Sequence, residues 1–281
     1  MFKNATILGI SPKFKFDTQR PKNLPFHPVT DLQLESSGWA PVRDGALTSG
    51  VGRHALMYFM QEKKHIPASA VETLVADKIA ELEKAQGFAP GKKARKELKE
   101  RVIDELLPRA LATRRRTAVW LDLDKHRLVI DSTSSPVIDA VNRALIRCFE
   151  DIGIQDVSWP GPRVVTEWLI ETPRDFDIDD EVELRYPGEH GKTVKFKAAN
   201  LGGVDVQVHV QKGGASVEAI AMTYDSRISF VMTSNMQLRR IKALDVITSA
   251  ETAKDVDRFY SEFTLIALEL GNLIDVLIEE A

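Results

Sequence analysis

Apolar side chains recur every three or four residues in four parts of the chain, a spacing typical of amphipathic helices. The pattern predicts helices at residues 67–87, 92–107, 136–152 and 253–280. Pro67 stands where the first helix can begin, and Gly87 stands where it can end. Because only a short turn at Pro90-Gly91 separates the first two helices, we expect them to pack together as a hairpin.

Alternation of apolar and polar residues predicts strands elsewhere. These segments are residues 5–10, 53–61, 117–123, 127–132, 182–186, 193–198, 216–224, 227–233 and 237–244. Val204, Val206, Val208 and Val210 also alternate, and this period of two favours a further strand. Tight turns join several neighbouring strands, so we predict antiparallel sheets and an α+β fold.

The composition is that of an ordinary globular protein. The 281 residues are 43% hydrophobic and 28% charged, which excludes extensive disorder. The single cysteine, Cys148, excludes an intrachain disulfide and any zinc site with two thiolates. We expect Cys148 to be a core residue in a reduced, cytoplasmic compartment. No apolar run is long enough to predict a signal peptide or a membrane helix.

Charge is distributed unevenly along the chain. Residues 84–116 hold eleven bases and four acids, a net charge of +7, whereas the remaining residues hold 27 bases and 37 acids, a net charge of −10. Lys92, Lys96 and Lys99 share one outer helix face. One basic segment on an acidic body is typical of an interaction surface, and a solvated helix face is the alternative interpretation.

Polyanion binding is the function that this basic segment favours. Lys and Arg on one helix face can neutralise phosphates along a duplex, and affinity then arises largely from counterion release. Residues 89–119 contain no aromatic side chain, and the sequence has no helix-turn-helix or zinc-finger signature. We therefore predict sequence-independent binding to duplex DNA. The candidate contacts are Lys92, Lys93, Arg95, Lys96, Lys99, Arg109, Arg114, Arg115 and Arg116.

Two carboxylate arrangements have spacings that a metal ion can use. Asp122 and Asp124 lie near Asp131 on a predicted hairpin, although such acids more often simply flank a turn. Asp44, Glu62 and Lys64 have the spacing of a metal-dependent nuclease, in which carboxylates bind the metal and lysine orients the water. The second pattern is short and common by chance, and we predict no metal or other cofactor.

Short motifs follow one another in a fixed order along nearly the whole chain. They are Phe2-Lys3-Asn4, Gly38-Trp39-x-Pro41, Glu62-Lys63-Lys64-x-Ile66-Pro67, Gly91-Lys92-Lys93, Leu106-Leu107-Pro108-Arg109-Ala110, Trp120-x-Asp122, Thr166-Glu167-Trp168-Leu169 and Arg227-Ile228-Ser229-Phe230-Val231. In this order they resemble the RdgC family of recombination-associated proteins. No single motif is specific, whereas the series is. Residues 11–37 depart from the family pattern.

The resemblance implies a non-enzymatic protein of the cytoplasm and nucleoid. Such a protein binds double-stranded DNA without regard to sequence, encircles it as a ring-shaped homodimer, and restrains the RecA recombinase. The resemblance also implies three regions. These are a central α/β region at 1–66 and 117–160, a protruding basic helical tip arm at 67–116, and a base region at 161–281 with the long C-terminal helix.

The resemblance also assigns roles to particular residues. Leu107 and Leu111 are expected near a dimer interface at the tip. Lys195 and Lys197 keep the charge of a basic stretch in the family, whereas Ala198 and Ala199 replace polar or basic residues there. Two other functions stay open: a nuclease that uses Asp44, Glu62 and Lys64, and a module that binds an acidic protein partner through the same basic arm.

Overall fold

The computed structural model describes residues 2–188, 191–197, 201, 204–235, 237–244 and 255–281. Its strands are β1 Ala5–Gly9, β2 Glu35–Ala40, β3 Thr48–Val51, β4 His54–His65, β5 Leu111–Asp122, β6 Arg127–Ile130, β7 Phe176–Arg185, β8 Thr193–Lys197, β9 Ser216–Tyr224, β10 Ile228–Thr233 and β11 Gln237–Ala243. Its α-helices are α1 Ala68–Gln86, α2 Lys92–Leu106, α3 Ser135–Cys148, α4 Pro162–Glu167, α5 Val204–Gln211 and α6 Asp255–Glu279. Short 3-10 helices cover Arg20–Asn23 and Leu107–Arg109.

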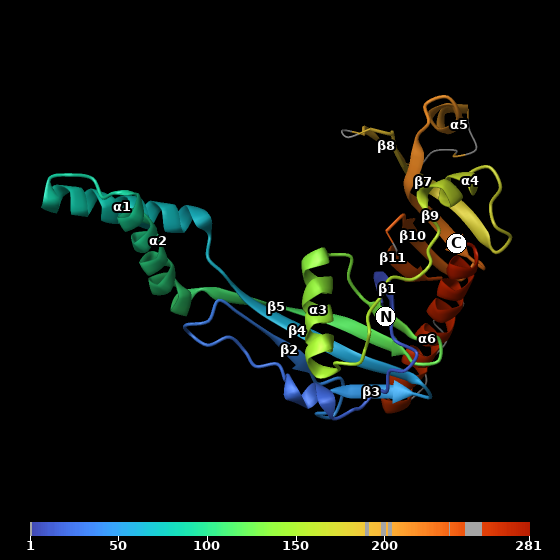
Figure 1. The fold of residues 1–281 in the computed structure, drawn as a ribbon, viewed down its shortest axis with the longest axis horizontal. Coiled ribbons are helices and arrows are strands. Elements are labelled where there is room, and N and C mark those ends of the chain that lie inside the picture. Colours follow the sequence, from blue (N-terminus) through green and yellow to red (C-terminus); the bar gives the residue numbers. More distant parts are fainter. Residues whose placement is uncertain (1, 189–190, 198–200, 202–203, 236, 245–254) are drawn as a thin grey trace.

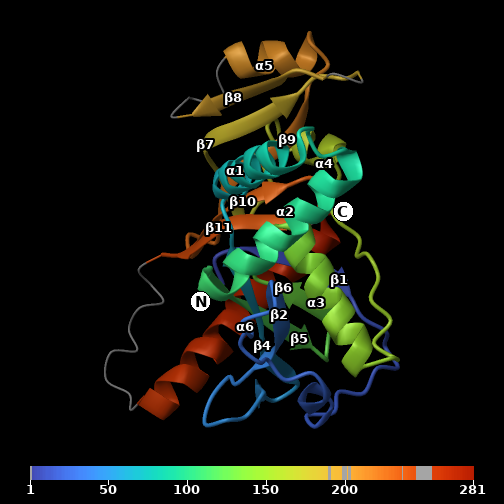
Figure 2. The ribbon, with the colours of Figure 1, turned by 90° about the vertical axis from the view of Figure 1, so that its left-hand side faces the viewer.

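The strands form one 11-stranded sheet in the order β2-β4-β5-β6-β1-β11-β10-β9-β7-β8, with β3 beside β2 on the same edge of β4. Neighbouring strands of this order pair antiparallel, and β1 joins the N-terminal strands to the C-terminal meander. The predicted α+β class, antiparallel pairing and long C-terminal helix are confirmed. Figures 1 and 2 show the sheet running through the body of the molecule.

The hairpin formed by α1 and α2 is inserted between the two longest strands. β4 and β5 pair along their whole length, from His54 opposite Asp122 to His65 opposite Leu111. The chain leaves β4 through Pro67, which precedes α1, and the left-handed Gly87 ends that helix. Figure 1 shows the hairpin extending away from the rest of the molecule.

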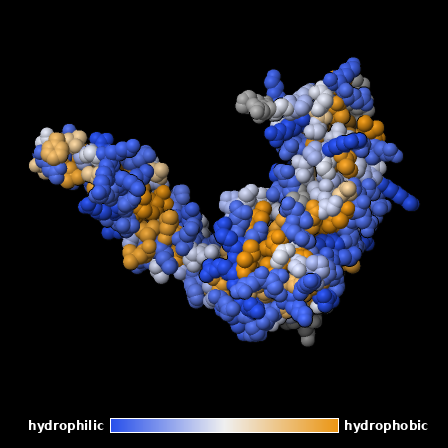
Figure 3. Space-filling model, in the orientation of Figure 1, coloured by the Kyte–Doolittle hydropathy of each residue, from blue (hydrophilic) through white to orange (hydrophobic). Residues whose placement is uncertain are grey.

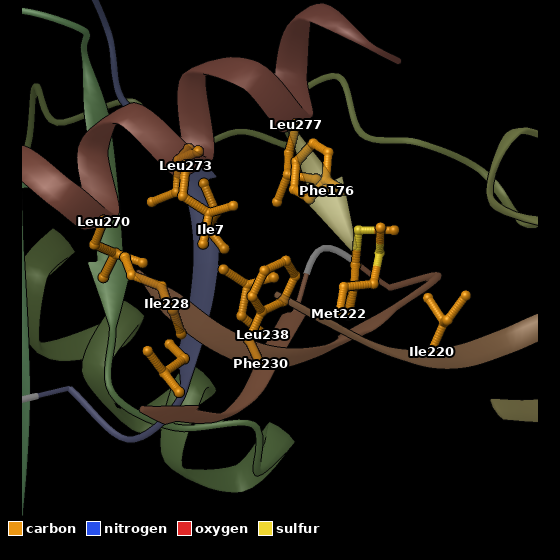
Figure 4. Packing of buried hydrophobic residues seen from close by; sticks show 14 of the residues in the cluster. Ile7, Phe176, Ile220, Met222, Ile228, Phe230, Leu238, Leu270, Leu273 and Leu277 are labelled. Carbon is orange, nitrogen blue, oxygen red and sulfur yellow. The ribbon is translucent and has the colours of Figure 1, made fainter. Parts of the chain in front are cut away.

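The two faces of the sheet carry different helices. On one face, Val141, Leu145 and Phe149 of the α3 region pack against Val119 and Leu121 of β5. On the other face, Leu270, Leu273 and Leu277 of α6 pack against apolar residues from β1, β9, β10 and β11. Figure 4 shows this second core, in which Phe230 and Leu238 lie beneath the helix. Cys148 is buried in the α3 core and lies 3.2 Å from the Trp39 indole nitrogen, as expected for a core residue.

The predicted strand at the alternating valines is wrong, because residues 204–211 form helix α5. Val206 is buried, and Val210, four residues later, packs on the same core, whereas Val208 is 41% exposed. The contacts therefore follow a period of four rather than two. Alternating valines are compatible with both a strand and a helix, so the sequence pattern alone does not distinguish the two. Burial in the tertiary structure does.

A glycine sets the close approach of one loop to the sheet. A Cβ on Gly38 would lie 2.7 Å from backbone atoms of Pro25 and Phe26. Trp39 exchanges backbone hydrogen bonds with Leu24 and Phe26 at this point. A side chain at position 38 would therefore push the loop off the edge of β2.

A partly buried ion cluster attaches α6 to the β5–β6 turn. Asp275 of α6 accepts a hydrogen bond from Arg127, whose side chain is only 7% exposed, and lies 3.2 Å from the Lys125 ammonium. Burial lowers the pKa of Arg127 from its ordinary value. The guanidinium charge thus depends on its nearby carboxylates for compensation.

We expect Asp275→Asn to lower the free energy of unfolding by about 2–3 kcal/mol, because it removes the carboxylate charge that accepts a hydrogen bond from a buried arginine. Urea unfolding followed by circular dichroism measures the change. Asp124→Asn is the matched control, since the Arg53–Asp124 pair is 64% and 54% exposed and should contribute less than about 1 kcal/mol. Equal losses in both variants would contradict the expectation.

Among the described residues, no helix has both the length and the apolar character required to cross a bilayer.

Candidate DNA-binding surface

The candidate bases of α2 lie on the outside of the hairpin. Leu98 and Val102 are buried, and they therefore define the inner side of α2. Lys78 of α1 forms a 2.6 Å ion pair with Glu105 of α2, which also links the two helices. The five candidate bases of α2 are exposed: Lys92, Lys93, Arg95, Lys96 and Lys99. Arg109 is exposed just after the helix.

Lys96 and Arg95 of α2 form contacts that a DNA phosphate can replace. The Lys96 ammonium lies 3.9 Å from Glu100, and both side chains are more than 60% exposed. Arg95 donates a hydrogen bond to the Pro90 carbonyl oxygen, which turns the side chain toward the α1–α2 turn. Exposed pairs of this kind are readily exchanged for phosphate contacts.

The three consecutive arginines lie on strand β5 rather than on the hairpin. The predicted strand at 117–123 begins six residues earlier, at Leu111. Side chains alternate along a strand, so Arg114 and Arg116 share the face of Trp120, which is the α6 face. Arg115 shares the face of Val119, which is the α3 face. The strand therefore divides this charge run between the two faces of the sheet.

Arg114 contacts an acidic and an aromatic neighbour, and Arg116 contacts an aromatic one. Arg114 donates a 2.6 Å hydrogen bond to Glu62, and its guanidinium lies 5.8 Å from the Phe26 ring centre. The Arg116 guanidinium lies 4.4 Å from the ring centre of Tyr58, within cation–π range. These contacts orient both guanidinium groups while their side chains stay exposed.

Glu62 is an internal structural residue. Its side chain is 6% exposed, and it accepts hydrogen bonds from the Val29 amide at 2.7 Å and from Arg114. The Val29 amide, followed by Arg114, holds the pKa of Glu62 below its ordinary value. The carboxylate thus ties the loop before β2 to the base of the hairpin.

The structure does not bring Asp44, Glu62 and Lys64 together. The Lys64 ammonium is buried and donates to the carbonyl oxygens of Thr30 and Asp31. Asp44 lies in the loop between β2 and β3, whereas Glu62 lies near the far end of β4. Asp44 lines a pocket together with His54, at the start of β4. Eight residues of strand, or about 26 Å, separate His54 from Glu62. The nuclease-like spacing of Asp44, Glu62 and Lys64 in the sequence therefore does not correspond to proximity in the structure.

The acids of the β5–β6 hairpin are also separated. Asp122 accepts the Asp124 and Lys125 amides and closes the turn. Asp131 lies at the other end of β6, where it accepts the amides of Lys3 and Asn4. The described residues contain no cluster of three or more His, Cys, Asp or Glu side chains suited to a metal ion.

The lysines of β8 lie opposite acids of β7. Glu181 pairs in register with Lys197, and Glu183 pairs with Lys195. The Lys195 ammonium lies 3.5 Å from Glu181 and 3.2 Å from Glu183. Glu181 also accepts a 2.8 Å hydrogen bond from Arg240, which lowers the pKa of Glu181. Ala198 and Ala199 lie outside the described residues.

The two leucines assigned to a dimer interface differ in exposure. Leu107 is 5% exposed and packs within its own chain, whereas Leu111 is 83% exposed. Leu74 of α1 and Phe88 at the hairpin end are also exposed, at 36% and 65%. Val71 is the only residue of α1 that is buried, so most of the apolar stripe predicted for that helix is only partly covered.

The hairpin and the C-terminal strands border a concave side of the molecule (Figure 3). Figures 1 and 2 place α4 and α6 on the side of the C-terminal strands that points away from the hairpin. Arg115, Lys195 and Lys197 lie on the opposite, α3 face by strand alternation. These three bases and the hairpin therefore border the same concave side.

Sequence reasoning missed the Glu181–Arg240 pair and the structural role of Glu62. The first pair joins residues 59 apart, and the second joins Arg114 to a residue 52 positions earlier. Strand register places Glu62 opposite Arg114, and bulges bring Glu181 and Arg240 together. Neither contact leaves a local pattern in the sequence. Only the charge of Glu181 and Arg240 was available as a signal.

Comparison with known proteins gives a consistent result. The family model described as "RdgC: Putative exonuclease, RdgC" matches residues 1–280. A protein of Burkholderia cenocepacia named "Recombination-associated protein RdgC" is 39% identical over 263 residues, covering 90% of this chain and 85% of that protein. Proteins with the same name from Ralstonia nicotianae and Herminiimonas arsenicoxydans are 38% and 35% identical over 262 residues, covering 90% of this chain and 85% and 87% of those proteins.

Proposed function

The chain belongs to the RdgC family, and we propose that it acts in recombination as a sequence-independent binder of double-stranded DNA. The main observation behind this proposal is the exposed basic surface of α2, which Arg109 and Arg115 continue along the base of the hairpin. Lys and Arg at successive positions along an elongated element match the repeating charge of a duplex backbone. The relatives' name supports the role in recombination.

We further propose that the protein acts as a ring-shaped homodimer in the nucleoid. Two observations support a dimer: the partly covered stripe of α1, and exposed Phe88 and Leu111. A symmetric interface would cover such apolar side chains on both subunits at once. In the proposed function, the ring restrains RecA by occupying the duplex on which a recombinase filament would act.

A non-enzymatic role fits the geometry better than cleavage by Asp44, Glu62 and Lys64. Glu62 and Lys64 use their polar atoms within the chain, and Asp44 lies far from both. The family description contains the word exonuclease, so cleavage has to be measured directly. Incubation of linear duplex with Mg²⁺ or Mn²⁺ should leave its length unchanged, and progressive shortening would favour the nuclease alternative.

A gel-shift series tests the binding itself. We expect similar affinity for unrelated duplex sequences, and a slope of log affinity against log salt of about −0.9 for each phosphate contact. Several contacts should therefore lower affinity steeply between 50 and 200 mM salt. A strong preference for one sequence, or salt-independent binding, would contradict the proposal. Competition by heparin but not by duplex DNA would favour an acidic protein partner.

A further inference from the structure

One face of the C-terminal strands contains a hollow of about 400 Å³ among the residues that the structure describes. Its floor consists of short side chains, among them Ala221 and Ser229, and a small cluster of Ala219, Ala221 and Val231 lies on the same face. Three acids of β7, namely Asp179, Asp180 and Glu181, line one side of the hollow, and Arg240 and Lys242 of β11 line the other. Of the three acids, only Glu181 forms an ion pair with Arg240.

Two strand irregularities set the opposing charges of this hollow. On β7, residues 179–181 lie opposite a single residue of β9, because Ile178 pairs with Met222 and Val182 with Ile220. On β11, the register shifts opposite β10, and Arg240 adopts a left-handed backbone with φ 54°. Bulges redirect side chains, and non-glycine residues rarely adopt such a φ.

The result is an ion pair that crosses two intervening strands. β9 and β10 separate β7 from β11, a distance of about 14 Å between their backbones. Arg240 nevertheless donates a 2.8 Å hydrogen bond to Glu181, over the short side chains between them. The Lys195 ammonium of β8 lies 3.5 Å from the same carboxylate, and it also donates a 3.2 Å hydrogen bond to Glu183 of β7. One glutamate therefore holds cations from both sides of the hollow.

The exposed fractions of the side chains show which members of the Glu181–Arg240–Lys195 network are free to move. The Glu181 side chain is 17% exposed, whereas Arg240 and Lys195 are 54% and 46% exposed. Long, exposed side chains exchange partners at small cost. Arg and Lys are also the side chains that bind phosphate, Arg in a bidentate manner. The two cations can thus leave Glu181 for a phosphate without repacking the sheet.

We propose that Glu181 is an internal counter-anion that holds Arg240 and Lys195 until a DNA backbone phosphate replaces it in this hollow. The inference rests on the proposed function. It adds a phosphate-binding site on the concave side of the molecule, opposite the hairpin. Lys242 and the Ser229 hydroxyl line the same hollow and are available to the arriving phosphate. Glu181 then limits affinity, because each binding event must first break its ion pairs.

Removal of the Glu181 carboxylate tests the proposal. Glu181→Gln should tighten duplex binding about 3- to 10-fold at 0.1 M salt, and steepen the salt slope by about one to two contacts. Glu181→Ala should give the same gain, which guards against an effect of the glutamine itself. Glu167→Gln is the matched control: it makes the same charge change on α4, where Glu167 pairs with Arg163, and should change affinity less than 2-fold.

The same substitution in a variant that lacks both cations distinguishes local competition for Arg240 and Lys195 from an effect of overall charge. When Arg240 and Lys195 are both changed to Gln, Glu181→Gln should add no more than the Glu167→Gln control. An equal gain in both backgrounds would overturn the inference, because Glu181 would then act only through overall charge. Equal affinities of the Glu181→Gln and Glu167→Gln proteins would also overturn it. Failure of the unaltered protein to bind duplex DNA would instead overturn the proposed function.

Discussion

Reversing Lys92, Lys96 and Arg115 to Glu is expected to weaken duplex binding about 10²- to 10³-fold at 0.1 M salt. Each lost phosphate contact removes about 0.9 from the salt slope, so the slope should become shallower by about three. The three side chains are exposed, on α2 and on the α3 face of β5, and the substitutions should leave the fold intact. Fluorescence anisotropy with a labelled duplex at several salt concentrations measures both quantities.

The matched control reverses three bases away from the proposed surface. Lys13, Lys22 and Arg163 are exposed, and their reversal changes the net charge by the same amount. The control should lose less than about 10-fold in affinity, because only long-range repulsion acts. Unchanged affinity in the folded hairpin variant would move the DNA site away from α2 and β5. Equal losses in both variants would show that net charge, rather than a surface, governs binding.

Retention on closed circular DNA is the second large effect we expect. A closed dimeric ring on a relaxed circular plasmid cannot leave over an end when high salt removes the phosphate contacts. The same ring on plasmid cut once can slide off. A wash above 1 M salt, where the Debye length is about 3 Å, should therefore retain protein on circles and release it from linear molecules.

The control for this experiment is an obstacle at both ends of the linear plasmid. Bulky end blocks should restore retention if topology holds the protein. Equal loss from circular and cut plasmid would exclude a stable ring. Light scattering at micromolar concentration gives an independent test, since a monomer would exclude both the ring and the two-fold dimer. Phe88→Glu and Leu111→Glu, at exposed apolar positions, should reduce retention on circles if these side chains contribute to closure.

Local patterns in the sequence determined most of the secondary structure. The helical stripes predicted α1, α2, α3 and α6 to within a few residues, because an amphipathic helix must place its apolar side chains on one face. Alternation likewise predicted the β9–β10–β11 meander. The basic segment at 84–116 was also visible, since formal charge does not depend on the fold. The motif series led to the RdgC family, which the comparisons confirm.

The tertiary structure alone decided how these charges are presented. Strand alternation on β5 separates Arg115 from Arg114 and Arg116, although the three are adjacent in sequence. Burial converts Glu62 and Lys64 from an apparent nuclease motif into internal hydrogen-bonding groups. Two bulges join Glu181 to Arg240 across two strands. Such contacts depend on register between distant segments, and local periodicity carries no information about that register.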